Sequence, residues 1–204
     1  MIDPQPVLLE GHGVRLEPLR RDHAGALQAA ASDGDVWKIW YVAAAGLAPG
    51  REQAWVETAL ANQEAGREIP WVVRETATNA IVGSTRYHDI VRAIDRVEIG
   101  YTFYGASWQR THVNTACKLL LLSHAFERLG CAVVGFRVDN LNERSQVAVS
   151  RLGARLDGVI RHFQPRLDGT ARDTHMYSIL AGEWPGVRQG LEARLARHRG
   201  AQAS

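Results

Sequence analysis

The sequence predicts a mixed α/β fold, in which helices flank a mostly antiparallel central sheet of about seven strands. Two observations indicate this. Strand-like runs follow one another across short turns, which produces antiparallel neighbours. One connection, between the runs at 97 and 131, passes through a long helical stretch and so permits a parallel pair.

The first 65 residues predict one strand and two helices. Alternating apolar side chains over 13–19 fit a half-buried strand, and 22–32 and 49–65 have helical propensity. Between these two helices the chain carries several aromatic residues in a segment broken by glycine and proline.

Three strand-like runs follow, over 69–76, 81–90 and 97–104, and their turn-like separators predict an antiparallel meander. The stretch 111–129 then predicts a long helix. Its middle, Leu119 to Leu122, is apolar all the way round, so we expect it to be buried on more than one side.

The last third predicts a strand over 131–138, a helix over 142–152 and two strands over 155–163 and 174–180. Asp168-Gly169 is a strong hairpin signal between these two strands. The stretch 183–199 closes the chain as an amphipathic helix. No repeat or linker interrupts the chain, so we expect one domain over 1–204, with 183–199 as a C-terminal helical extension.

Composition excludes several classes of function. Lys plus Arg (24) nearly balance Asp plus Glu (22), and a formal net charge of +2 does not predict a nucleic-acid partner. No apolar run predicts a signal peptide or a membrane span, so we expect a cytoplasmic protein with no membrane partner. Cys117 and Cys131 lack neighbouring ligands, which predicts buried, reduced thiols and no metal site.

The stretch with the clearest chemical signal runs from the strand at 97–104 through 109–115 into the long helix. A short polar turn that feeds a helix presents unpaired backbone N–H groups at the positive end of the helix dipole. This geometry binds phosphate, and Arg110, Thr111 and Thr115 add donors for a pyrophosphate. An ordinary strand-to-helix turn is the alternative.

A second polar segment follows the next strand, at 139–145. Asn142 is placed to cap the following helix, with Ser145 one turn along the same edge. Both segments leave the carboxyl ends of adjacent strands, so we expect them to open on the same side of the sheet.

These two segments resemble a known family. The run EIGYTFYGASWQRTHVNTACKLLLLSHAFERLG, followed by VDNLNERSQVAVSRLGARLDGVIRHF, is similar to the GNAT superfamily of acetyl-CoA dependent N-acetyltransferases. Within it the chain looks closest to the ribosomal-protein N-terminal acetyltransferases of the RimJ and RimL type. The resemblance covers nearly the whole chain and implies a GNAT-like acyl-CoA N-acyltransferase fold.

The resemblance also implies where acetyl-CoA, the co-substrate, would bind. The family's phosphate-binding pattern falls on Gln109, His112 and Asn114. The backbone of residues 110–115 would hold the pyrophosphate, and the strand edge at 100–103 would pair with the pantetheine arm. Asn142 would meet the pantetheine amide, and Ser145 the thiol. The binding residues implied are therefore Tyr101, Thr102, Phe103, Gln109, Arg110, Thr111, His112, Val113, Asn114, Thr115, Asn142 and Ser145.

Two positions depart from the family pattern. His112 stands where the family usually has glycine, and Ala116 where this branch often has glutamate. A side chain at 112 is expected either to crowd the phosphates and strain the backbone, or to donate to phosphate when protonated.

Acetyl transfer to an amine needs a base, a stabilised oxyanion and a proton for the thiolate. Glu98 is the first candidate base, since its side chain is expected on the face opposite Val97 and Ile99. Ser145 or Tyr177 is the candidate proton donor. The alternatives are a solvated charge for Glu98 and a core position for Tyr177. His88 and Asp89, His124 and His175 are secondary candidates.

The predicted function is acetyl transfer from acetyl-CoA to a primary amine, by direct attack in a ternary complex. A protein N-terminus and a small amine both stay open as acceptors, as does a homodimer. Trp37, Trp40, Tyr41 and Trp55 are expected to wall the acceptor site. The alternative function is a CoA-binding module with weak catalysis and a regulatory or structural role.

Overall fold

A computed structural model describes residues 1–166 and 168–202 of the 204-residue chain. Its strands are β1 (Leu9–Gly11), β2 (Val14–Pro18), β3 (Ile69–Glu75), β4 (Ile81–Val91), β5 (Arg96–Tyr104), β6 (Val133–Asp139), β7 (Arg155–Pro165) and β8 (Ala171–Leu180). Its α-helices are α1 (Ala24–Ser32), α2 (Glu52–Glu64), α3 (Val113–Ser123), α4 (Glu143–Leu152) and α5 (Trp184–Gln202).

The strands form one sheet of eight in the order β1-β2-β3-β4-β5-β6-β8-β7, so the predicted mixed, mostly antiparallel sheet is confirmed. The additional strand is β1, which pairs antiparallel with β2. His12 and Gly13 turn the chain between them with φ values of 53° and 79°. A three-residue strand shows no measurable alternation, so no pattern in the sequence indicated it.

The neighbours β5 and β6 are the one parallel pair among the described strands. Their pairing covers three positions, from Arg96 opposite Val133 to Glu98 opposite Gly135. Beyond Glu98, β5 continues to Tyr104 without a partner on this side. The sheet is therefore split between β5 and β6 from residue 99 onward.

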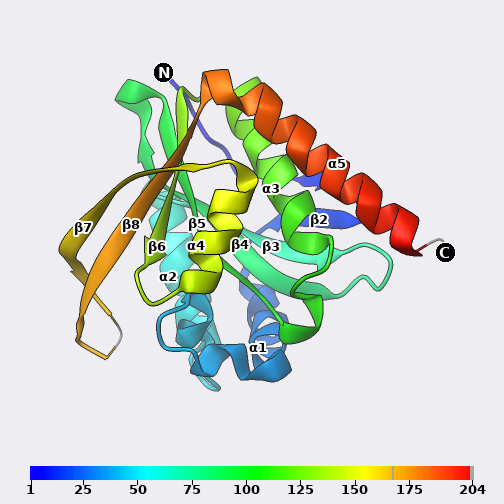
Figure 1. Cartoon of the computed structure of the whole chain (residues 1–204). Helices are drawn as coiled ribbons and strands as arrows, with labels where there is room; N and C mark the ends of the chain where they lie inside the picture. Colours follow the sequence, from blue (N-terminus) through cyan, green and yellow to red (C-terminus); the bar gives the residue numbers. More distant parts are fainter. Residues whose placement is uncertain (167, 203–204) are drawn as a thin grey trace.

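Helices cover both faces of the sheet (Figure 1). One apolar core joins the sheet to α3, α4 and α5, and includes Val97, Ile99, Leu121, Leu152 and Leu191. A smaller core lies on the other face under α1 and α2, with Leu27, Val56, Val72 and Phe103. Helix α5 lies alongside α3, so α3 is buried between the sheet and α5, as its apolar middle predicts.

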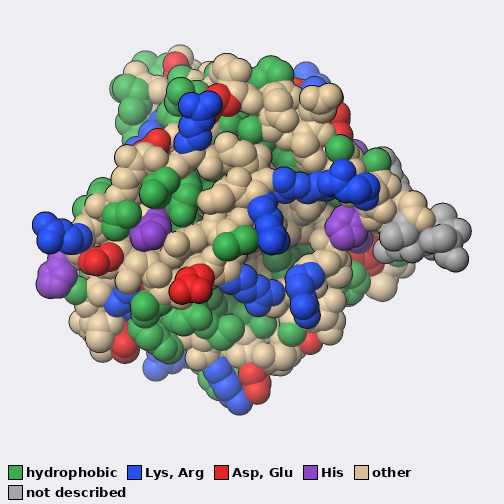
Figure 2. Space-filling model, viewed as in Figure 1, with side chains coloured by type: hydrophobic (Ala, Val, Ile, Leu, Met, Phe, Trp, Pro, Cys, Tyr) green, Lys and Arg blue, Asp and Glu red, His purple; other side chains and the backbone are tan. Residues whose placement is uncertain are grey.

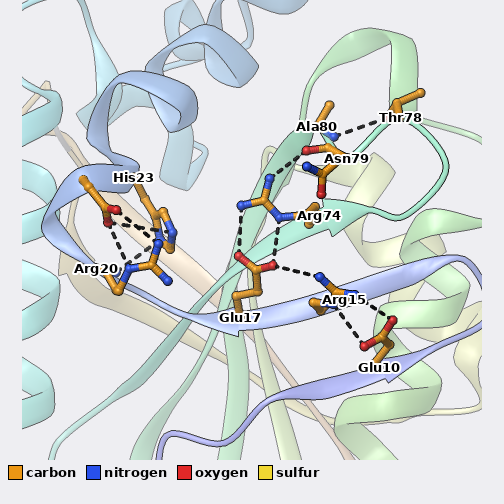
Figure 3. Close-up of polar contacts among 10 residues, drawn as sticks. Glu10, Arg15, Glu17, Arg20, His23, Arg74, Thr78, Asn79 and Ala80 are labelled. Atoms are coloured by element: carbon orange, nitrogen blue, oxygen red, sulfur yellow. Dashed lines mark hydrogen bonds and ion pairs between the residues drawn. The ribbon is translucent and has the colours of Figure 1, made fainter.

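Charged side chains link the first three strands in a ladder (Figure 3). Arg15 lies opposite Arg74 in the β2–β3 register, an unfavourable pairing by itself. Glu17 lies between them: Arg74 donates to it at 2.8 Å, and Arg15 Nη1 is 3.6 Å away. Glu10 accepts two further hydrogen bonds from Arg15 at 3.0 Å. Alternating charge therefore stabilises this edge of the sheet.

Most predicted element bounds agree with the structure to within a few residues. The predicted helix over 111–129 is α3, which begins at Val113 and continues as a π-helical turn over His124–Arg128. Both cysteines are free and buried, as expected. Glu183 precedes α5, and Val187, Leu191 and Leu195 of α5 are buried on one face.

No helix in residues 1–166 and 168–202 combines the length and the apolar character needed to cross a membrane. Over the same ranges, no group of three or more His, Cys, Asp or Glu side chains is arranged to hold a metal ion.

Candidate active site

The polar loop before α3 lies on the surface and is held in shape by short hydrogen bonds. Gln109 Nε2 donates to the Tyr104 carbonyl at 2.8 Å, and the Thr111 hydroxyl donates to the Trp108 carbonyl at 2.7 Å. Arg110 has a φ of 62°, a left-handed conformation that non-glycine residues seldom adopt. Such a value lets several successive amides point to the same side, which creates an anion-binding concavity.

Most backbone N–H groups of this loop have no hydrogen-bond partner among the described residues. Within the described part of the chain, the N–H groups of Arg110, Thr111, His112, Asn114 and Thr115 make no hydrogen bond, whereas Val113 N–H donates to the Thr111 hydroxyl at 3.3 Å. These unpaired donors surround the N-terminus of α3, where the helix dipole favours an anion. The loop therefore has the donors that a phosphate requires.

His112 does not cause the backbone strain expected from its position. Its φ is −66°, so the backbone there does not need glycine, and the strained residue of the loop is Arg110. The imidazole lies against Gly13 of the β1–β2 turn, where an added Cβ would be 2.9 Å from Nε2. The expectation of backbone strain at 112 was wrong.

The second motif lies at the start of α4 and contacts the first. Asn142 caps the helix, since its side-chain oxygen accepts from the Ser145 N–H at 3.1 Å. Arg144 Nη2 donates to Gln109 Oε1 at 2.6 Å, which ties α4 to the loop before α3. Figure 2 shows Lys and Arg side chains gathered over α3, α4 and α5, a distribution that favours an anionic ligand.

A β-bulge interrupts β5 where the sheet is split. The β4–β5 register shifts between Ser84 and Arg86, and Tyr101 takes a φ of 51°. Next to it, Thr102 shares a 2.8 Å hydrogen bond with Thr85 and accepts from Lys118 Nζ at 3.1 Å. A bulge redirects backbone groups away from the regular ladder, here at the strand edge that lacks a partner.

Glu98 lies in the sheet interior with no exposed surface. Gly135 of β6 leaves room for it, since a Cβ there would be 2.9 Å from Glu98 Cγ. Arg137 Nε lies 2.6 Å from Glu98 Oε2, and Arg96 contacts Oε1. Burial raises the pKa of Glu98, and the two guanidinium groups oppose that shift. The solvated alternative for this side chain is excluded.

His88 lies beside Glu98 on the same face of the sheet. Its Nε2 is 4.0 Å from Glu98 Oε2, and its ring meets that of Tyr101 edge to face at 5.2 Å. Burial, together with the charge of Arg137, lowers the pKa of His88 to about 3, so the imidazole is neutral at pH 7. Asp89 follows on β4 and pairs with Arg137.

The remaining candidates fall on the other side of the sheet. Tyr177 is 6% exposed and belongs to the core that contains α3 and α5, as the alternative interpretation expected. His124 stacks on Tyr87 with ring centroids 6.0 Å apart, and His175 lies 6.3 Å from Tyr177. Cys117 is buried, and burial raises the pKa of its thiol to about 12, which removes it as a nucleophile.

An arginine and aromatic cluster occupies the face of the sheet that carries Glu98. Arg86 lies over the Trp55 and Tyr101 rings, at 4.2 and 4.6 Å from their centroids. Arg137 lies 5.4 Å from the Phe163 ring, and Arg166 lies 5.6 Å from the Trp40 ring. Segments far apart in sequence therefore meet beside the split in the sheet, two of them through the predicted wall residues Trp40 and Trp55.

A family model for the acetyltransferase (GNAT) domain matches residues 14–155. The chain belongs to the GNAT acetyltransferase family. Membership of the GNAT family makes the protein an acetyl-CoA-dependent acetyltransferase. The matched residues include both polar motifs and the split between β5 and β6.

Three proteins illustrate the relationship of this GNAT chain to others. The N-acetyltransferase YoaA of Bacillus subtilis (strain 168), itself uncharacterized, is 27% identical over 125 residues, which cover 61% of this chain and 70% of YoaA. A GCN5-related N-acetyltransferase from Brucella melitensis has a TM-score of 0.85 at 28% identity, with 94% of this chain and 86% of that chain covered. RimJ of Mycobacterium smegmatis, solved with CoA-disulfide, has a TM-score of 0.77 at 21% identity, covering 93% and 95%. The likeness to RimJ agrees with the resemblance found in the sequence and establishes the shared fold.

Sequence reasoning missed three charged residues of this GNAT site: Arg86, Lys118 and Arg137. Arg137 stands inside a strand-like run that is otherwise apolar, and Lys118 stands inside the apolar stretch of α3. A charge at a position that the pattern assigns to the interior was the available signal, because buried charges need a partner or a function.

Proposed function

We propose that this chain transfers the acetyl group of acetyl-CoA to a primary amine, by direct attack within a ternary complex. One observation carries the proposal: the unpartnered edge of β5 runs beside a loop of unpaired amides at the start of α3. The amides of a pantetheine arm can form hydrogen bonds with the edge of β5, and the oxygens of a pyrophosphate can accept hydrogen bonds from the amides of the loop.

In this proposal the cofactor contacts are made largely by backbone. The N–H groups of residues 110–115 hold the pyrophosphate, and the edge at 100–103 pairs with the pantetheine. Asn142 and Ser145 meet the pantetheine end from α4, where Asn142 caps the helix by accepting from the Ser145 N–H.

The chemistry requires the ammonium nitrogen to lose two protons: the first leaves before attack, and the second leaves the tetrahedral intermediate and balances the proton that the thiolate gains. The amine nitrogen forms a bond to the acetyl carbon, and the carbon–sulfur bond breaks. Because Glu98 is fully buried, we propose that it acts as the base without contacting the ammonium group. It receives the ammonium proton through neutral His88 or through a water molecule. Backbone N–H groups at 101–103 stabilise the oxyanion, and Ser145 supplies the proton for sulfur, because Tyr177 is buried in the apolar core.

Residues 1–204 are proposed to act as one GNAT domain. The core under α5 supports this, since Trp184, Val187, Leu191 and Leu195 share it with the sheet and α3. Helix α5 is then a C-terminal extension that stabilises the domain rather than a separate unit.

The test combines binding and turnover. Titration calorimetry with acetyl-CoA measures the cofactor site, and thiol release across a panel of amines measures transfer. Glu98→Gln is expected to lower kcat by about 100-fold or more while the dissociation constant of acetyl-CoA changes little. Glu192→Gln on the exposed face of α5 is the matched control and should behave as wild type.

The result that rejects catalysis is tight acetyl-CoA binding with no turnover on any amine, which favours the CoA-binding module. The result that rejects Glu98 as the base is an unchanged kcat in a folded Glu98→Gln variant. Circular dichroism of each variant separates a loss of chemistry from a loss of fold, since a neutral amide at this position would leave two partly buried guanidinium groups without their carboxylate.

A further inference from the structure

One guanidinium on the same face of the sheet as the arginine and aromatic cluster has no adequate partner. Arg172 of β8 has a side chain that is only 16% exposed, and it lies 3.7 Å from Asp139. It donates no hydrogen bond within the described part of the chain, and its Nε is buried. Buried charged groups are ordinarily paired and hydrogen-bonded.

Asp139 is already satisfied by other donors. Arg166 contacts both its oxygens, at 2.8 and 3.0 Å, and the Leu141 N–H donates to Oδ1 at 2.9 Å. Arg172 is therefore the second cation at a carboxylate that one arginine and an amide already use.

The surroundings of Arg172 are positive. Burial lowers the pKa of Arg172; Asp139 opposes this, while Arg166 and Arg137 lower the pKa further. Arg137 is itself shared between Glu98 and Asp89. Three guanidinium groups thus gather with fewer acceptor oxygens than their donors can use.

A second unpartnered group lies on the same face of β8. Thr174 pairs with Asp139 across the β6–β8 ladder and is two residues from Arg172. Its hydroxyl is fully buried and has no hydrogen-bond partner in residues 1–166 and 168–202. A hydroxyl and a guanidinium with unused donors are the groups that a carboxylate requires.

The place of this site relative to the chemistry limits the ligand. Arg137 contacts Glu98, the proposed base, and also lies close enough to Arg172 to affect its titration. Arg137 lies opposite Met176 in the β6–β8 register, so the anionic group would bind on the same face of the sheet as Glu98, beyond Arg137.

We propose that Arg172, with Arg137 and Thr174, binds an anionic group of the acceptor, so that the substrate is an amine with a carboxylate a few bonds away. This inference rests on the proposed acetyl transfer. A free amino acid and a peptide N-terminus followed by an acidic side chain both offer this chemistry.

The test compares acceptors that differ only in the charge of one group. The first pair is γ-aminobutyrate and its amide; the second is Ser-Glu-Ala and Ser-Gln-Ala, both amidated at the C-terminus. A kcat/KM at least about 10-fold higher for the acid of either pair is expected, from a charge-assisted bidentate contact. Preference in the first pair identifies a small acceptor, and preference in the second identifies a peptide.

The variants test which residue makes the selection. Arg172→Gln should lower kcat/KM for the acid at least about 10-fold more than for the amide, and Arg172→Lys should restore part of the preference for the acid. Arg155→Gln is the control: it removes an exposed arginine at the other end of the β7–β8 ladder and should keep the preference.

The outcomes separate the two proposals. No turnover on any amine, with acetyl-CoA bound, rejects acetyl transfer. Equal turnover of acid and amide in both pairs overturns the anion site but does not contradict acetyl transfer. An equal loss of turnover on acid and amide in Arg172→Gln has the same meaning. If that variant does not fold, glutarate is tested as an inhibitor of the wild-type enzyme. Inhibition that is competitive with the acceptor but not with acetyl-CoA supports the anion site, and an absence of inhibition overturns it.

Discussion

At the scale of single residues, burial decides what a charged side chain does. Glu98, Arg86 and Lys118 would be ordinary solvated groups on a surface, but each is at most 6% exposed here. Removing water makes each ion depend on a specific neighbour. For Glu98 the neighbours are two arginines and a neutral histidine, which is why its titration and its chemistry are linked.

Lys118 gives the clearest prediction about pH. Burial lowers its pKa to about 8, against about 10.4 in an unfolded chain. Between these values the unfolded state binds more protons, so the contribution of Lys118 to stability rises with pH, by about 3 kcal/mol in total. Lys118→Met should remove this rise. Urea unfolding of wild type and variant from pH 7 to 11 measures the difference.

Lys38→Met is the control for the loss of a lysine, since Lys38 is exposed and pairs with Asp35. Parallel stability curves for wild type and Lys118→Met between pH 8 and 10.5 would contradict the assignment.

Gly100 is required by contact rather than by its backbone angle. A Cβ there would lie 2.2 Å from His88 Nε2, and the His88 ring is held by Tyr101 and Glu98. Gly100→Ala is therefore expected to destabilise the protein by about 1–3 kcal/mol through overpacking. Gly158→Ala, where no atom lies within 4 Å of the added Cβ, is the matched variant and should be nearly neutral. Chemical denaturation compares the two.

At the scale of elements, the loop before α3 shows the limits of a motif. Its position and its free amides were predictable, because a polar turn that feeds a helix always leaves N–H groups unpaired. The residue with the left-handed backbone conformation, Arg110, could not be predicted. The hydrogen bonds of the Gln109 side chain with Tyr104 and Arg144 could not be predicted either. Contacts between segments decide such details, and no local pattern encodes them.

His112 yields the prediction at this scale. Because its φ is already helical and its ring packs on Gly13, replacing it by glycine frees no space for phosphate. His112→Gly should leave the affinity for CoA within about twofold and lower stability by a few tenths of a kcal/mol at this N-cap. Titration calorimetry and thermal unfolding measure the two effects. A clear gain in affinity would show that the ring does crowd the ligand.

At the scale of the whole molecule, the sequence was sufficient to predict the order of the elements. It was not sufficient to predict which side chains meet on the face of the sheet that carries Glu98. Periodicity predicted seven of the eight strands and all five α-helices within a few residues. The arginine and aromatic cluster combines Trp40, Arg86, Arg137 and Phe163 from four separate segments. Only folding brings them together, so no spacing along the chain could indicate them.

Ligand binding should be visible in global stability. A ligand that binds only the native state at 100 times its dissociation constant adds about 2.7 kcal/mol to the free energy of unfolding. We expect acetyl-CoA to raise the Tm accordingly, and to protect the amides at 99–103 from hydrogen exchange. Adenosine 3′,5′-bisphosphate, which lacks the pantetheine, should raise the Tm less and leave those amides unprotected. Equal protection by both ligands would contradict pairing along β5.

The short parallel ladder between β5 and β6 also bears on the order in which substrates arrive. Five strands lie on one side of that ladder and three on the other, and three residue pairs join them directly. The arginines on the face of the sheet where we propose the acceptor binds come from both sides: Arg86 from β4, Arg137 and Arg172 from β6 and β8. A cofactor arm lying along β5 would fix the spacing between these two groups. Steady-state kinetics should therefore show sequential addition with acetyl-CoA first, because the acceptor meets a fully formed surface only in the loaded enzyme.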